Sequence, residues 1–222
     1  MIEIVIPTCK TYPEIRHQVR AIEYTASGTK VMYSCVNTYT SKNRNAMLDA
    51  CEGEFMIMLD DDIRGFYRGW ASQLIESMIL HPEILFCSAF IVHRDGIPQL
   101  GIVPEKMDEV YIPENERVLG ACFALRRREV VSRGIRFDEQ FKGWGYEDTD
   151  FLEQIKSSFG AGHIWVNGKA KVIHDNEHKN DSEVTFNRNK RYYELKHPED
   201  KTVKSHTYGI IKKENENGIN GY

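Results

Sequence analysis

Three adjacent aspartates, Asp60, Asp61 and Asp62, directly follow a short apolar run at residues 55–59. Carboxylates this close repel one another unless a cation or a hydrogen-bond donor lies among them. Because oxygen ligands suit hard divalent ions, the triplet could hold Mg²⁺ or Mn²⁺. Acidic clusters are also common in solvated turns and at helix N-termini, so the spacing alone leaves both interpretations open.

A histidine farther along the chain could complete a metal site. His174 ends an apolar segment, where a histidine is more often a hydrogen-bonded structural residue. One imidazole beside carboxylates is nevertheless a reasonable ligand set for Mn²⁺. The pair His174 and His178 resembles half of a zinc motif, but it lacks the glutamate after the first histidine. The sequence therefore favours manganese over zinc.

A second acidic segment, residues 143–150, reads Gly-Trp-Gly-Tyr-Glu-Asp-Thr-Asp. The flanking glycines let the backbone bend while Trp144 presents a flat ring, a common way to stack on a sugar. Glu147 or Asp148 could accept the proton of a hydroxyl nucleophile. The same acidic run is typical of an N-cap and first helical turn, and capping is its commoner role. Both roles can coexist, since a cap fixes the position of the carboxylate.

Basic side chains mark the start of another expected helix, at residues 41–51. Lys42 and Arg44 lie in its first turn, where an anionic ligand such as a diphosphate would be favoured. Ordinary surface charge is the alternative. The chain has no G-x-x-x-x-G-K-[ST] motif, which excludes a P-loop, and no G-x-G-x-x-G motif, which disfavours a nicotinamide or flavin site.

Strand-like and helix-like segments that alternate along the chain must position these residues. This alternation predicts an α/β fold with a mostly parallel central sheet and helices on both faces. Ligands of such sheets bind beyond the carboxyl ends of the strands, where the aspartate triplet stands. Residues 95–116 break the rhythm and predict a long loop with an extra hairpin, and Asn167-Gly168 is typical of a hairpin turn. Strands are expected at residues 2–7, 30–36, 55–59, 84–92, 118–125 and within 163–174, and helices near residues 11–28, 41–51, 74–79, 127–133 and 149–159.

The composition predicts one large domain, residues 1–198, followed by a polar tail, residues 199–222. The 222 residues include 29 Lys+Arg and 33 Asp+Glu, a net charge of −4, with 41% hydrophobic and 28% charged residues. These values exclude a collagen-like, coiled-coil or wholly disordered chain and disfavour a general nucleic-acid binder. No apolar run approaches the length that spans a bilayer. Five scattered cysteines without a C-x-x-C pair, and a start unlike a signal peptide, suggest the reducing cytoplasm.

Taken in order, these pieces resemble a glycosyltransferase of the GT-A fold. Residues 4–8 resemble the first strand of family 2, and residues 41–45 its Ala-Arg-Asn helix start. The aspartate triplet matches the D-x-D metal and donor motif. Residues 137–148 are similar to the acceptor-side motif of the β-1,4-galactosyltransferases, and residues 172–180 resemble the metal-histidine segment of that group. The resemblance covers roughly residues 2–180.

The resemblance implies an inverting glycosyltransferase that moves a sugar from a nucleotide-sugar, UDP-linked, to a hydroxyl acceptor with the help of Mn²⁺ or Mg²⁺. Asp62 and His174 would ligate the metal, and Asp148 would be the general base. Asn37 stands near the position where the family often carries an acidic residue. The implied donor-side residues are Pro7, Thr8, Cys9, Asn37, Lys42, Arg44, Asn45, Asp60 and Asp61, and the implied acceptor-side residues are Trp144, Gly145 and Glu147.

The sequence leaves two other functions as alternatives. A nucleotidyltransferase would use a similar sheet and acidic site, but a glycine-rich loop usually follows its first strand, and residues 7–10 are not glycine-rich. A non-catalytic sugar-binding module would explain Trp144 but not the aspartates, His174 and the candidate base together. The acceptor is left open among a glycan, a lipid-linked sugar, a protein and a modified nucleobase, because loops carry no readable code for it.

Overall fold

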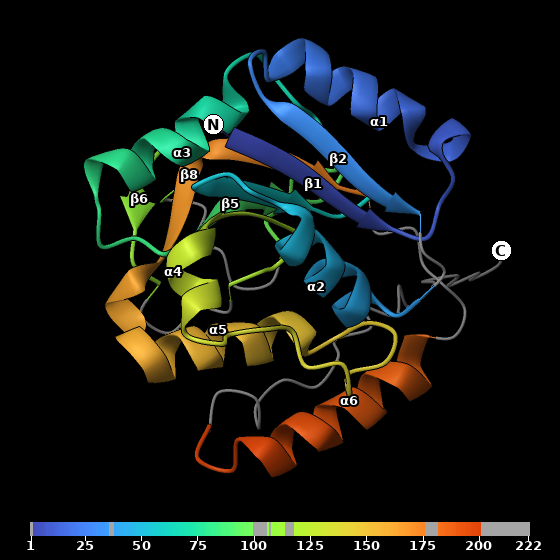
Figure 1. Ribbon diagram of the computed structural model, residues 1–222, viewed down its shortest axis with the longest axis vertical. Coiled ribbons are helices and arrows are strands. Elements are labelled where there is room, and N and C mark those ends of the chain that lie inside the picture. Colours follow the sequence, from blue (N-terminus) through green and yellow to red (C-terminus); the bar gives the residue numbers. More distant parts are fainter. Residues whose placement is uncertain are drawn as a thin grey trace, which may run out of the picture.

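A mixed sheet forms the middle of the molecule (Figure 1). The computed structural model describes residues 2–35, 38–99, 106, 108–113, 118–175 and 182–200. Within them the strand order is β2-β1-β3-β7-β5-β8-β4, and β6 also pairs with β8. The strands are β1 (Ile2–Thr8), β2 (Lys30–Cys35), β3 (Phe55–Leu59), β4 (Ile63–Arg64), β5 (Phe86–Val92), β6 (Val110–Tyr111), β7 (Cys122–Arg126) and β8 (Ile164–His174).

Most of the strands run in one direction, as the sequence predicted. β1 is parallel to β2 and to β3, and β5 is parallel to β8. β7 lies between β3 and β5 and is antiparallel to both. β5 therefore runs in the same direction as β3. Every residue of β3 and β5 is buried, because helices cover both faces of these central strands.

The helices form a layer on each face of the sheet (Figure 1). The apolar stripes of α1 and α3 share a core with Ile57, and those of α2 and α5 share a second core with Met58. Thr11 and Glu14 form the predicted capping box at the start of α1. The predicted layered α/β fold is confirmed. The helices are α1 (Tyr12–Thr25), α2 (Thr40–Ala50), α3 (Trp70–Leu80), α4 (Arg127–Ser132), α5 (Glu147–Phe159) and α6 (Ser182–Lys196), with a 3₁₀ turn at Ala161–His163.

Two local predictions are wrong. β8 is one continuous strand, and the Asn167 side chain accepts hydrogen bonds from the backbone N–H groups of Lys169 and Ala170, at 3.0 and 3.2 Å. Asn167-Gly168 therefore serves a bulge in the pairing with β5 rather than a hairpin turn. The helix expected from residue 149 begins at Glu147, because Tyr146 takes a left-handed backbone, φ 72°, and is the N-cap.

The long loop and the tail are described only in part. The loop expected at residues 95–116 supplies β6, which pairs with β8. The division into a domain at 1–198 and a tail at 199–222 stays a prediction, since residues 201–222 lie outside the described part of the chain. No helix of the described segments is long and apolar enough to cross a membrane.

Helix α6, which was not predicted from the sequence, packs on the glycine-rich loop before α5. Phe186 and Tyr193 of this helix form a buried cluster with Phe141 and Tyr146. The Asn189 side-chain amide donates to backbone carbonyls of this loop, those of Trp144 and Gly145 at 3.0 Å and that of Lys142 at 3.3 Å. The helix therefore fixes the loop through both apolar packing and hydrogen bonds.

The fit of α6 against the loop predicts that Gly145→Ala destabilises the protein. Gly145 has φ 93°, and an added Cβ would lie 2.7 Å from the ring of Phe186. Backbone strain and overpacking together should lower the free energy of unfolding by roughly 1–3 kcal/mol, measured by urea denaturation. Gly162→Ala is the matched control, because its Cβ would meet nothing within 4 Å. Equal stability of the two variants would contradict this packing.

Candidate active site

The aspartate triplet forms a tight turn at the carboxyl end of β3, where the sequence placed it. The Asp60 backbone N–H donates to the carbonyl of Ala121 at 2.8 Å, which ties the turn to the start of β7. From α1, the Gln18 amide donates to the carbonyls of Asp60 at 2.8 Å and Ile63 at 3.2 Å. These backbone contacts fix the directions in which the three carboxylates point.

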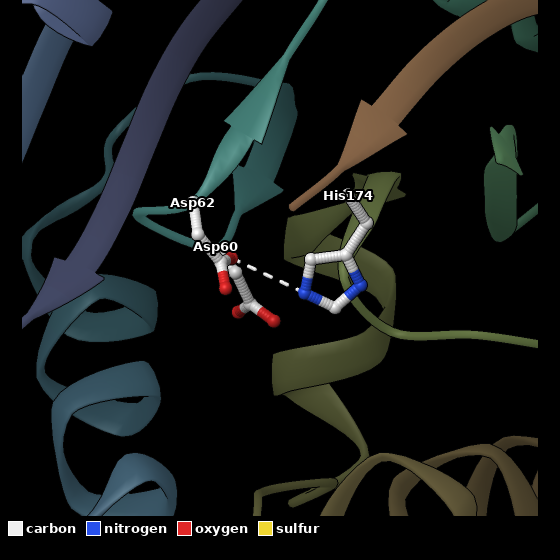
Figure 2. Close-up of side chains that lie close together, drawn as sticks. All are labelled: Asp60, Asp62 and His174. Atoms are coloured by element: carbon white, nitrogen blue, oxygen red, sulfur yellow. Dashed lines mark ion pairs between the residues drawn. The ribbon is translucent and has the colours of Figure 1, made fainter. Parts of the chain in front are cut away.

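Asp60, Asp62 and His174 form a candidate metal centre (Figure 2). Their ligand atoms all lie within 4.8 Å of one another, and Nε2 of His174 is 3.2 Å from Oδ1 of Asp62. β4 brings them together, because Ile63 pairs with His174 directly after the triplet. One imidazole nitrogen and two carboxylates fit Mn²⁺. The structure thus unites the predicted ligands Asp62 and His174 and adds Asp60.

The charges of this cluster support each other electrostatically. Burial opposes ionisation of both His174 and Asp62, but their mutual hydrogen bond and charges outweigh it, so the pKa of His174 is raised and that of Asp62 is lowered. Burial raises the pKa of Asp60, against the opposing charge of Arg44. A divalent cation would compensate the two carboxylates in place of the proton on His174.

Asp61 points away from this cluster, toward the end of β1. Its carboxylate accepts a hydrogen bond from the Thr8 hydroxyl and lies 2.9 Å from Nζ of Lys10. On either side of the buried Thr8, Pro7 is half-buried and Cys9 is exposed. The predicted donor-side residues of β1 and the triplet are therefore neighbours.

Arg44 lies buried at the centre of the site, with 2% of its surface exposed. One guanidinium nitrogen donates to Oδ1 of Asp60 at 2.8 Å and to the carbonyl of Gly120 at 3.2 Å. The other terminal nitrogen lies 3.5 Å from Oε1 of Glu147. Burial works against its charge, but Asp60 and Glu147 outweigh this and raise the pKa of Arg44. Arg44 therefore links the aspartate turn to the start of α5.

Other predicted donor-side residues lie around Arg44 or outside the described chain. Lys42 is exposed on α2. The Asn45 amide makes two hydrogen bonds with the backbone of Phe137. Its oxygen accepts the Phe137 N–H at 3.0 Å, and its nitrogen donates to the Phe137 carbonyl at 2.9 Å. Asn37 and His178 lie outside the described residues.

Two carboxylates occupy the first turn of α5. Glu147 is 5% exposed, and burial, opposed by Arg44, raises its pKa to about 7. Asp148 is half-buried; its Oδ2 accepts the Gly120 N–H at 3.0 Å and its Oδ1 accepts the Thr149 N–H at 2.8 Å. A Cβ on Gly120 would lie 2.5 Å from Cβ of Asp148, so this contact requires glycine.

Trp144 is half-buried beside the same helix. Its ring packs against Phe186 of α6, with ring centroids 5.1 Å apart. The aromatic side chain thus has a structural contact in addition to the acceptor role that the sequence suggests.

Several residues of the site were not predicted from sequence. Each is a single polar residue or glycine, far along the chain from the motif it supports, and shows no local signal. They are Lys10, Gln18, Gln99, Gly120 and Asn189.

No protein-family model and no curated protein matches the sequence. Among solved structures, the S. aureus TarS 1–349 structure has a TM-score of 0.57 and 16% identity over 90% of this chain and 66% of its own. Mycobacterium tuberculosis glucosyl-3-phosphoglycerate synthase, with Mn²⁺, UDP and glucosyl-3-phosphoglycerate, has a TM-score of 0.54 and 16% identity over 80% of this chain and 73% of its own. GalNAc-T7, with UDP, GalNAc and Mn²⁺, has a TM-score of 0.59 and 12% identity over 87% of this chain and 47% of its own.

These similarities show that the chain has the fold of the GT-A glycosyltransferases. The fold expected from the sequence motifs is thus confirmed. The chain spans less than two thirds of the TarS structure and about half of GalNAc-T7.

The burial of Glu147 predicts a pH-dependent effect of Glu147→Gln on stability. Between pH 4.5, the ordinary pKa, and about 7, the folded protein holds a proton on Glu147 that the unfolded chain has lost. The contribution of Glu147 to stability therefore falls as the pH rises through this window. Glutamine cannot ionise, so the variant lacks this loss. The free energy of unfolding of the variant minus that of wild type should rise by up to about 3 kcal/mol from pH 4.5 to 7, measured by urea unfolding.

Glu76→Gln, on the exposed side of α3, is the control and should follow wild type across the series. A constant difference between Glu147→Gln and wild type would show that Glu147 keeps its charge when buried.

Proposed function

We propose that the protein is an inverting, metal-dependent glycosyltransferase that moves a sugar from a UDP-linked donor to a hydroxyl acceptor. The observation that carries the proposal is the buried link from the ligand set Asp60, Asp62 and His174 through Arg44 to the carboxylates that begin α5. The fold supports it, since similar structures contain UDP and Mn²⁺. The free thiols of the described cysteines agree with a cytoplasmic location.

Asp60, Asp62 and His174 would hold Mn²⁺ or Mg²⁺. When bound, the ion would neutralise the charge that develops on the departing diphosphate. Arg44 keeps the Asp60 carboxylate in place by a 2.8 Å ion pair.

On the donor side, the end of β1 and the aspartate turn would contact the nucleotide-sugar. Asp61, held by Thr8 and Lys10, would face the ribose or the sugar. The base pocket would be lined by Pro7, Thr8, Cys9 and Asn37, with Lys42 and Asn45 near the nucleotide.

On the acceptor side, Asp148 would take the proton of the attacking hydroxyl. The N–H groups of Gly120 and Thr149 orient its carboxylate. Oδ1 also accepts the Thr149 hydroxyl at 3.4 Å, so Oδ2 is the oxygen that keeps a lone pair for the proton. Attack opposite the leaving group in one displacement inverts the anomeric carbon. Trp144, Gly145 and Glu147 would shape the acceptor wall, which could receive a glycan, a lipid-linked sugar, a protein or a modified nucleobase.

The proposal is tested by incubating the protein with a panel of UDP-sugars and Mn²⁺ and measuring UDP release. Even without an acceptor, slow hydrolysis of one donor is expected, because water can replace the hydroxyl. Binding without turnover, in the presence of glycan, lipid-linked, protein and nucleobase acceptors, would favour a sugar-binding module. Formation of a nucleotide-sugar from a nucleoside triphosphate and a sugar phosphate would favour a nucleotidyltransferase.

The ligand set predicts that UDP binds tightly only together with a divalent ion. Calorimetry of UDP binding should show strong affinity with Mn²⁺ and a large loss in EDTA. His174→Ala should weaken Mn²⁺ dependence more than Mg²⁺ dependence, because the imidazole nitrogen is the better ligand for the softer ion. His81→Ala, at the C-terminal end of α3, is the control. Equal UDP affinity with and without EDTA would remove the metal from the proposal.

The role of Asp148 predicts that Asp148→Asn lowers the transfer rate by about 10²–10⁴-fold, because the amide cannot accept the proton. Its NH₂ group would also face a backbone N–H, so a small loss of stability is expected, with UDP affinity retained. The measurement is the rate of the folded variant at saturating donor and metal. Glu147→Gln is assayed beside it. A near wild-type rate for Asp148→Asn, with a large loss for Glu147→Gln, would assign the base to Glu147.

A further inference from the structure

The second ring nitrogen of His174 has a buried partner. Nδ1 of His174 lies 3.0 Å from Oε1 of Gln99, a residue that is 3% exposed. The amide nitrogen of Gln99 lies 3.1 Å from Nδ1 of His93. The three side chains form a chain of hydrogen bonds that ends at Nδ1 of His174, whereas Nε2 of the same ring faces Asp62.

Backbone contacts hold Gln99 beside the end of β5. Its N–H donates to the carbonyl of Ile91 at 3.0 Å, and Val92 forms a β-bridge with Pro98, so the chain folds back on the end of β5. β5 pairs with β8 there, with Val92 opposite Ile173. Gln99, on the segment folded back along β5, and His174, at the end of β8, are thus both anchored by backbone pairing, and neither needs to move for the contact to form.

We propose that Gln99 is the positioning residue for the metal-binding histidine, fixing the ring of His174 and keeping the Nδ1 proton in place. Two orientations of the Gln99 amide could satisfy its neighbours. With the carbonyl toward His174, as in the structure, Nδ1 carries the proton and the neutral ring turns the Nε2 lone pair toward Asp60 and Asp62. With the amide reversed, the neutral ring would carry its proton on Nε2 and could not bind a metal there.

His93 contacts the other end of the Gln99 amide. With Nδ1 of His93 unprotonated, this nitrogen accepts the Gln99 N–H and directs the Gln99 carbonyl toward His174. The Nδ1–H group of His174 is a donor both in the imidazolium, which pairs with Asp62, and in the neutral ring that a metal requires. Metal binding therefore needs no rearrangement of this contact. Hydrogen-bond partners of this kind typically alter metal affinity by 10–100-fold.

The inference rests on the metal site proposed above, so it is tested on the full chain by two independent readouts. The first is the Mn²⁺ dissociation constant, measured by calorimetry without donor. Gln99→Met keeps the length and burial of the side chain but removes the acceptor, and should weaken Mn²⁺ binding by about 10–100-fold. Gln99→Glu keeps an acceptor toward His174 and should stay within about threefold of wild type. Gln73→Met, a half-buried glutamine of α3, is the control and should bind as wild type.

The second readout is the NMR signal of the His174 Nδ1–H proton in the metal-free protein at pH 6. Wild type and Gln99→Glu should show this proton protected by its hydrogen bond, and Gln99→Met should lose it. Wild-type Mn²⁺ affinity in Gln99→Met, or absence of the protected proton in wild type, would overturn the inference. If wild type binds no Mn²⁺, the proposed metal fails, while the proton signal still decides whether Gln99 orients His174. Should Gln99→Met not fold, Gln99→Asn, whose shorter side chain withdraws the carbonyl, replaces it.

Discussion

The buried guanidinium of Arg44 is the interaction on which the site depends. A buried cation must be paired, and here Asp60 and Glu147 pair it from two elements far apart in sequence. The guanidinium also donates to the carbonyl of Gly120 and lies over the ring of Phe137. Because the geometry of each carboxylate depends on the same cation, the aspartate turn and the start of α5 cannot shift independently. The metal side and the acceptor side of the proposed reaction are therefore parts of one electrostatic unit.

The loop that precedes Glu147 requires an unusual backbone conformation, with α6 packed closely against it. Gly143 and Gly145 both have positive φ, and a Cβ on either would collide with α6. Tyr146 also has positive φ, which costs a non-glycine residue energy, and its ring is buried against Phe186 and Tyr193. Packing and the Asn189 hydrogen bonds offset this strain. The glycines around Trp144 thus permit close packing, in addition to the bending that the sequence suggested.

The sequence predicted the layered fold and the position of the aspartate triplet because both depend on local patterns. The alternation of β-branched and amphipathic segments identifies the strands and helices, and the triplet follows a strand that is apolar throughout. The hairpin at Asn167 failed because the same dipeptide serves turns and bulges, and the choice between them depends on pairing with β5. The contacts of Arg44, Gln99 and Asn189 could not be predicted, since each joins segments whose proximity only the tertiary fold determines.

The charge balance of the site explains why metal and donor should bind together. Five carboxyl groups converge on it, from the triplet, Glu147 and Asp148, of which Glu147 is only partly ionised near pH 7, whereas the nearby cationic partners include Lys10, Arg44 and His174. A diphosphate would add further negative charge beside Asp60 and Asp62, so it would be repelled unless a divalent ion came with it. The ion in turn would gain phosphate oxygens to complete a coordination shell that the protein supplies only in part. Donor and metal would then each raise the affinity of the site for the other, as reciprocal linkage requires.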